Sequence, residues 1–445
     1  MSLAKLVATL FLLLPWAVQG SGQQLLVHAG TILFDPAQPP LANATLVIED
    51  GNIKSIEDGF VTAETLGWDA ASVTVVDLSG AFVLPGLIDL HVHLTTPVDP
   101  GGELRVVTRN AADLALLGVE LGRQNLAAGF TTVVDLGTGR RDHELAIYAL
   151  RAAIEQGTVA GPRILAAGSP LSPTGASRTG KFRSDVEAAI PPQGVCDGAD
   201  QCRRVVREQI ARGADLINLY NSGSLNDAHI AEQTFTDEEF EAIVGTAHGL
   251  GRIVIADGHT AAGINAALRA GVDIVDTAPW PDEESWRLMR ETGAAFEPHL
   301  YAFQQVVGDS PADLDSGTMH WIPSPIMQRL FDIKNKPFSA ERAYREGIPI
   351  VFGSDTGVVP HGSNAGEFAE LVKIGMTPAE AIGAATAQAA RVLRLDHLIG
   401  TLEPGKAADL IATSASPLED IRELERVRFV MKGGVVFSND LAGSR

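Results

Sequence analysis

Two stretches of alternating apolar and polar residues lie near the two ends of the chain and flank its central region. Residues 24 to about 80 show this alternation in LLVHAGTILF and ATLVIEDGNIKSIED, with a turn at Gly51–Asn52. Near the C-terminus, KAADLIAT and VRFVMKGGVVF repeat it around a second turn at Gly433–Gly434. A period of two is typical of strands with one buried face. The pattern therefore predicts a small β-sandwich formed by both termini, from residues 23–80 and 400–445.

Between these flanks, short β-branched runs alternate with amphipathic helical stretches. We expect helices over residues 111–128, 199–212, 237–250 and 261–270. The strands are expected to end near Leu94, Asp135, Ala167, Leu219, Ala256, Asp276, His299 and Gly353. Eight such units in series predict an α/β fold, a (β/α)8 TIM barrel over residues 81–399. A doubly wound open sheet is the main alternative, but no glycine-rich phosphate-binding motif follows the first strand.

The first residues have the layout of an export signal. Lys5 precedes a nearly uninterrupted apolar run, Leu6–Val18, and the small residues Gly20, Ser21 and Gly22 follow it. This order predicts a signal peptide over residues 1–22 and a periplasmic or extracellular protein that has no membrane contact after cleavage. A retained anchor is the alternative, but the run is short for spanning a bilayer.

The composition limits which classes of binding partner are plausible. The 445-residue chain carries a formal net charge of −21, which disfavours nucleic acids and anionic membranes as ligands. A small-molecule substrate fits better, and a homo-oligomer is compatible with the sequence. The two cysteines, Cys196 and Cys202, are too few for a structural zinc site and favour a short disulfide in an oxidising compartment. Sequence alone does not show that their Cβ atoms face each other.

The strongest chemical signal lies in GLIDLHVHL. His91 and His93 lie two positions apart at an expected strand end, so both side chains point to one face and can bind one divalent metal. Asp355 follows the apolar run PIVFGS and can both bind that metal and accept a proton from water. An N-cap role is the alternative for Asp355.

Further polar residues follow other strands and should meet them at the same rim of the barrel. Asp257 and His259 again share a face, as a candidate metal ligand and a candidate acid/base. His299 and Tyr220 are candidate substrate contacts at their strand ends. Arg178, in the loop after the third strand, could bind a substrate carboxylate, although an ordinary solvated loop is an equal interpretation.

The motifs together resemble the metal-dependent amidohydrolase superfamily, in the branch near imidazolonepropionase and the Xaa-Pro dipeptidases. The resemblance covers nearly the whole chain after residue 22, from VLPGLIDLHVHL through PIVFGSDTG to ATAQAARVLRLDHLIGTLEPGKAADLIA. It implies a ligand set of HxH, a carboxylated lysine, two further histidines and an aspartate. His91, His93 and Asp355 match that set.

Three positions depart from the set that the resemblance implies. Asn218 stands where the bridging lysine is expected, and Asp257 and Thr277 stand where the two further histidines are expected. Asparagine cannot form a carbamate, and threonine is a poor substitute for imidazole. We therefore expect at most one high-affinity metal, Zn²⁺ first, with Mn²⁺ or Mg²⁺ as alternatives, bound by His91, His93, Asp355 and Asp257.

Three functions remain open from the sequence. The first is an exported hydrolase that uses one metal to cleave a small amide, a dipeptide or a cyclic amide, with Asp355 and His259 as catalytic residues. The second is a binding protein that kept the fold and lost catalysis. The third is lyase or isomerase chemistry on the same scaffold, since a fold does not determine the reaction.

Overall fold

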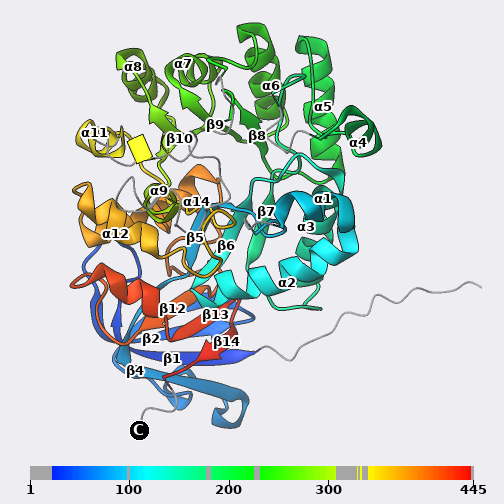
Figure 1. Cartoon of the computed structure of the whole chain (residues 1–445). Coiled ribbons are helices and arrows are strands. Elements are labelled where there is room, and N and C mark those ends of the chain that lie inside the picture. Colours follow the sequence, from blue (N-terminus) through cyan, green and yellow to red (C-terminus); the bar gives the residue numbers. More distant parts are fainter. Residues whose placement is uncertain are drawn as a thin grey trace, which may run out of the picture.

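A computed structural model of the chain describes residues 23–97, 101–176, 182–224, 231–306, 328, 331–332 and 339–441. A β/α barrel and a mixed β-sheet lie side by side (Figure 1). Among the described residues, no helix is long and apolar enough to cross a membrane. The predicted signal peptide, residues 1–22, lies outside the described residues.

Seven strands of the barrel are regular. They are β5 (Leu87–Val92), β6 (Phe130–Asp135), β7 (Arg163–Ala166), β8 (Ile217–Tyr220), β9 (Val254–Thr260), β10 (Ile274–Trp280) and β11 (Ala295–Glu297). The eighth position is taken by residues 350–356, which form parallel bridges to β11 at Phe296 and to β5 at Val92. A further parallel bridge, between Leu171 and Leu219, joins the β7 side to β8. The barrel is therefore closed, as predicted.

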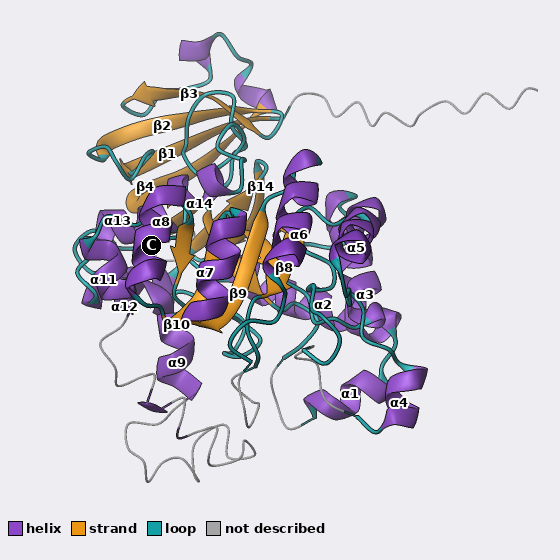
Figure 2. Cartoon of the chain, turned by 90° about the horizontal axis from the view of Figure 1, so that it is seen from above, coloured by secondary structure: helices purple, strands orange, loops and turns teal. Residues whose placement is uncertain are grey.

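Most helices lie around the outside of this barrel, and a few lie beyond the ends of its strands (Figure 2). They are α1 (Gly102–Thr108), α2 (Ala111–Ala127), α3 (Arg141–Glu155), α4 (Ser184–Ala189), α5 (Ala199–Arg212), α6 (Asp237–Gly249), α7 (Ala261–Ala270), α8 (Glu283–Thr292), α9 (Leu300–Val306), α11 (Ser339–Arg345), α12 (Gly366–Lys373), α13 (Pro378–Ala384) and α14 (Ala387–Val392). Capping residues mark the start of several of these helices. Asn110 and Thr236 each form a capping box at the start of α2 and α6, which satisfies backbone N–H groups that a helix leaves unpaired.

The second body is one mixed sheet from both ends of the chain, seen in Figure 1 as blue and red strands lying together. Its strands are β1 (Gln24–Ile32), β2 (Leu41–Glu49), β3 (Asn52–Asp58), β4 (Val73–Pro85), β12 (Leu410–Thr413), β13 (Phe429–Lys432) and β14 (Val435–Asn439), in the order β14-β13-β12-β4-β1-β2-β3. Three 3₁₀ helices, η1 (Glu64–Leu66), η2 (Ala70–Ser72) and η4 (Ile421–Arg426), accompany them. The expected boundary at residue 80 falls inside β4, because that strand continues to the start of the barrel.

Packing joins the two bodies. The sheet has its own apolar cluster, which includes Leu25, Leu46 and Phe429. At the junction, the Arg163 guanidinium lies 2.7 Å from an oxygen of Asp409, whose other oxygen accepts the N–H of Gly433 at 2.7 Å. A buried aspartate thus connects β7 of the barrel to the turn between β13 and β14, which holds the sheet against the N-terminal end of the barrel strands.

Candidate metal centre

Three predicted side chains meet at the C-terminal end of the barrel strands. His91 and His93 come from β5 and the residue after it, and Asp355 comes from the neighbouring eighth strand. His91 Nε2 and His93 Nε2 lie 3.1 Å apart, and each lies close to Asp355 Oδ1, at 3.4 and 3.3 Å. We name these three residues the outer cluster. It is the grouping that HxH and Asp355 predict.

The spacing of the outer cluster fits a metal ion. Bonds of about 2.0–2.2 Å at tetrahedral angles separate ligand atoms by roughly 3.3–3.6 Å, close to the distances observed here. Asp355 Oδ1 is buried without a hydrogen-bond partner. The side chains of His93 and Asp355 are 20% and 21% exposed, whereas that of His91 is 4% exposed. One side of the cluster therefore opens to solvent, as a catalytic metal site requires.

Charge within the outer cluster shifts its protonation. Burial opposes a charge on His91, but the carboxylates of Asp276 and Asp355 outweigh it and raise the pKa of His91 to about 9. Burial would raise the pKa of Asp355, yet the nearby His91 and His93 lower it. Opposite charges on His91 and Asp355 thus attract each other within the cluster.

A buried carboxylate positions the outer cluster. Asp89 Oδ1 accepts the backbone N–H groups of His91, at 3.1 Å, and of Ser354, at 3.0 Å. Its Oδ2 accepts the hydroxyl of Ser354 at 2.5 Å and the side-chain amide of Asn364 at 2.6 Å. Since these bonds join β5 to the eighth strand, Asp89 sets the position of the two histidines relative to Asp355. Sequence reasoning overlooked this residue, although its polarity inside an apolar strand was visible.

A second group lies deeper in the barrel. We name His91, Asp276, Glu297 and His299 the inner cluster, because their ligand atoms lie within 4.8 Å of one another and all four residues are buried. His299 Nε2 is 2.9 Å from Asp276 Oδ1 and 3.4 Å from Glu297 Oε1, and His91 Nδ1 is 3.0 Å from Asp276 Oδ2. His299, predicted as a substrate contact, is thereby placed below the barrel mouth, with a 2% exposed side chain.

The other predicted residues lie beside these groups. Asp257 belongs to neither cluster, and its Oδ1 is 3.5 Å from the Thr277 hydroxyl. His259 Nδ1 faces the carbonyl oxygen of Gly223 at 3.1 Å, and Tyr220 is 8% exposed at the end of β8. Arg178 lies outside the described residues. Among the described residues, Asp257 is therefore not grouped with the ligand atoms of His91 and His93.

Three residues around the clusters have left-handed backbone conformations. Thr277, His299 and Asp355 have φ values of 70°, 52° and 54°. Such angles cost conformational energy for residues other than glycine, and most of all for a β-branched residue such as threonine. They persist only where surrounding contacts determine them. Their position at three barrel strand ends marks this rim as a constrained region of the fold.

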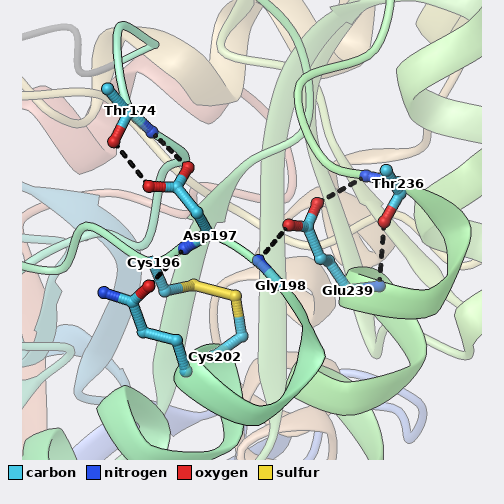
Figure 3. Close-up of a disulfide and its surroundings, with 8 residues drawn as sticks. Thr174, Cys196, Asp197, Gly198, Cys202, Thr236 and Glu239 are labelled. Atoms are coloured by element: carbon cyan, nitrogen blue, oxygen red, sulfur yellow. Dashed lines mark hydrogen bonds between the residues drawn. A yellow bond between two sulfur atoms is a disulfide. The ribbon is translucent and has the colours of Figure 1, made fainter.

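A disulfide stabilises the loop region that follows β7. Cys196 and Cys202 are bonded, and both are fully buried (Figure 3). Next to it, Asp197 accepts two hydrogen bonds from Thr174, and Glu239 accepts the N–H of Gly198 at 2.5 Å (Figure 3). The disulfide that the two cysteines suggested is present, and it attaches this loop to α5.

Comparison with known proteins identifies the family. Residues 82–437 match the Amidohydrolase family. Ochratoxinase from Aspergillus niger is 33% identical over 439 residues, which cover 93% of this chain and 86% of that protein. The chain belongs to the amidohydrolase family. A crystal structure of a Xaa-Pro dipeptidase with bound methionine in the active site superposes with a TM-score of 0.81 at 31% identity, over 94% of this chain and 100% of the other. Imidazolonepropionase from Geobacillus kaustophilus is 26% identical over 438 residues, 90% of this chain and 91% of the relative.

Membership makes this chain a hydrolase of carbon–nitrogen bonds with metal-binding His/Asp groups. Within this amidohydrolase, the expected lysine position is occupied by Asn218, whose amide donates to the Leu136 carbonyl at 3.1 Å. Thr277 occupies the position expected for a histidine, and its hydroxyl lies 3.4 Å from His299 Nδ1. Asn218 and Thr277, which stand where metal ligands were expected, thus contact other protein groups.

Proposed function

We propose that this amidohydrolase uses one catalytic divalent ion, bound by His91, His93 and Asp355, to hydrolyse a small amide or dipeptide. The observation that carries the proposal is the outer cluster. Its three ligand atoms are 3.1–3.4 Å apart, and the cluster faces solvent on one side. Three nitrogen and oxygen ligands with an open fourth position are a competent catalytic zinc arrangement, and Mn²⁺ or Mg²⁺ can also use such a carboxylate.

The residues of the chain have separable tasks in this mechanism. An ion held by these residues would supply a water nucleophile at neutral pH and would polarise the scissile carbonyl. His91 and His93 present their Nε2 atoms on one side, and Asp89 maintains their distance from Asp355. Asp355 directs Oδ1 toward the histidines, so its other oxygen accepts the proton of the attacking water.

His259 is the proposed second acid/base. It is a buried residue of β9 whose Nδ1 lies 3.1 Å from the Gly223 carbonyl. With the proton on Nδ1 in that contact, the lone pair of Nε2 can exchange a proton with the leaving amine. Tyr220, one strand away, remains the candidate to line the substrate site.

The names of the relatives support a substrate with an amino-acid part. One solved relative is a Xaa-Pro dipeptidase that holds methionine in its active site, and another is a prolidase complexed with N-methylphosphonate-L-proline. Arg178 is our candidate to bind the carboxylate of such a substrate. We also propose that the protein is exported, on the basis of the basic start and apolar run before residue 23.

A panel of substrates tests this function. Metal-free protein and protein reconstituted with ZnCl₂ or MnCl₂ are incubated with Xaa-Pro dipeptides, N-acyl amino acids and cyclic amides, and products are followed by mass spectrometry. We expect hydrolysis only with metal, and loss of at least about 100-fold in His93→Ala. The matched control is His397→Ala, since His397 is an exposed histidine outside both clusters.

Each alternative function has its own result in this experiment. Bound metal without product formation across the panel would contradict the hydrolase and favour a binding protein. Products formed without uptake of oxygen from ¹⁸O-labelled water would favour lyase or isomerase chemistry.

A further inference from the structure

The inner cluster contains three potential metal ligands that do not belong to the outer cluster. Asp276, Glu297 and His299 come from β10, β11 and the second residue after β11, and their side chains are at most 2% exposed. His91 borders both groups, with Nε2 toward Asp355 and Nδ1 toward Asp276. A neutral imidazole offers one lone pair, so His91 cannot serve two ions at once. Three side chains remain for the inner position.

The contacts in the inner cluster are close but poorly directed as hydrogen bonds. Asp276 Oδ2, His299 Nε2 and both carboxylate oxygens of Glu297 are buried, and none has a hydrogen-bond partner among the described residues. Yet His299 Nε2 lies 2.9 Å from one oxygen of Asp276 and 3.4 Å from one of Glu297. Donor and acceptor atoms at such distances, without hydrogen-bond angles, are arranged around a common point more than toward each other.

The buried charges of the inner cluster also favour a bound cation. Two carboxylates share this buried interior, where the imidazoles of His91 and His299 are their charge partners, and a buried charge without full compensation is costly. A divalent cation between them would offset both charges and satisfy the unpartnered oxygen atoms. Two carboxylates and one imidazole suit first-row divalent ions such as Mn²⁺ and Zn²⁺.

We propose that Asp276, Glu297 and His299 bind a second, buried divalent cation, separate from the catalytic ion of the outer cluster. The site lies below the barrel mouth and has no exposed ligand, so its role is structural: it joins β10 to β11 beneath His91. The proposal goes beyond the single catalytic ion and departs from the expectation, made from the sequence, of at most one tightly bound metal. It does not require the chain to be catalytic.

A glycine on the eighth strand provides the space for this site. A Cβ atom added at Gly353 would lie 1.6 Å from Glu297 Oε1 and 2.5 Å from Glu297 Cδ. The φ angle of Gly353 is not in the left-handed region, so conformational freedom is not the reason for glycine here. The absence of a side chain at Gly353 is what lets the Glu297 carboxylate lie against the eighth strand.

Counting ions tests the site. Full-length protein is stripped with a chelator, reconstituted separately with ZnCl₂ and MnCl₂, and freed of excess metal before elemental analysis. We expect two ions per chain in the wild type and one each in Glu297→Gln and His93→Ala. Anomalous scattering should place the remaining ion in the outer cluster of Glu297→Gln and in the inner cluster of His93→Ala. Asp257→Asn, which changes a carboxylate outside both clusters, should keep two ions.

A second measurement covers the case in which a variant folds poorly. In His93→Ala, added ZnCl₂ should raise the melting temperature by several degrees, because an ion that binds only the folded state stabilises it. The rise should disappear in His93→Ala/Glu297→Gln and in His93→Ala/Gly353→Ala. It should persist in His93→Ala/Gly245→Ala, since a Cβ at Gly245 meets nothing within 4 Å. One ion in the wild type, or an unchanged count in Glu297→Gln, would overturn the proposal and leave the inner cluster as a support for His91.

Discussion

A buried histidine near the outer cluster should make stability depend on pH. His143, in α3, is 6% exposed, and its Nδ1 lies 2.9 and 3.0 Å from the hydroxyls of Thr95 and Thr96. Burial, with the added positive charges of His93, Arg105 and Arg140, lowers the pKa of His143 from 6.5 to about 4. The folded protein therefore holds this proton less tightly than the unfolded chain does.

The sign and size of the effect follow from linkage. A histidine with a depressed pKa contributes full stability above its unfolded pKa, and stability falls as pH decreases from 6.5 toward 4. With these two values, His143 alone lowers the free energy of unfolding by about 2 kcal/mol between pH 7 and pH 5. The variant His143→Asn keeps a hydrogen-bonding atom near the position of Nδ1 but does not titrate in this range.

Urea unfolding at pH 7, 6 and 5 measures the difference. We expect the wild type to lose about 2 kcal/mol more than His143→Asn over this interval. His361, which is partly buried and has a pKa lowered to about 4, titrates in both proteins and cancels in the comparison. Parallel curves for the two proteins would refute the reasoning, because they would mean that the His143 proton is bound equally in both states.

Three other predictions concern the metal, the disulfide and export. Asp257→Ala should leave metal content unchanged while His93→Ala lowers it, measured by elemental analysis; equal losses would return Asp257 to the ligand set. Replacing Cys196 and Cys202 by serine should cost about 2 kcal/mol in urea unfolding, as expected for closing a loop of sequence separation 6; an unchanged midpoint would contradict this value. N-terminal sequencing of protein from an extracytoplasmic fraction should begin near residues 20–23, and a product that starts at Met1 would count against cleavage.

The barrel was predictable because its signals are local. The expected helices 199–212 and 261–270 coincide with α5 and α7. Local residues end these helices: Gly213 and Gly271 adopt left-handed conformations after the last turn. Strand ends were expected within a few residues of where they lie, because apolar runs of this length and composition bury both faces in a parallel barrel.

The sites were only partly predictable. HxH at a strand end places two imidazoles on one face through the period of a strand, and the structure brings Asp355 to them. The same rule placed Asp257 and His259 on one face, but it could not tell which neighbour each would meet. Glu297 gave no signal because a single acidic residue in a short strand looks like a solvated end, whereas in the structure it is fully buried.

What the sequence determined by itself is the set of elements, the order in which they wrap, and the residue types offered at the barrel mouth. These depend on periodicity, capping and composition, which act over a few neighbouring residues. Tertiary structure alone decided that Asp276, Glu297 and His299 converge, that Gly353 leaves space for one of them, and that Asp257 contacts Thr277. Those contacts depend on the relative stagger of strands that are far apart in the chain, and no local pattern encodes that stagger.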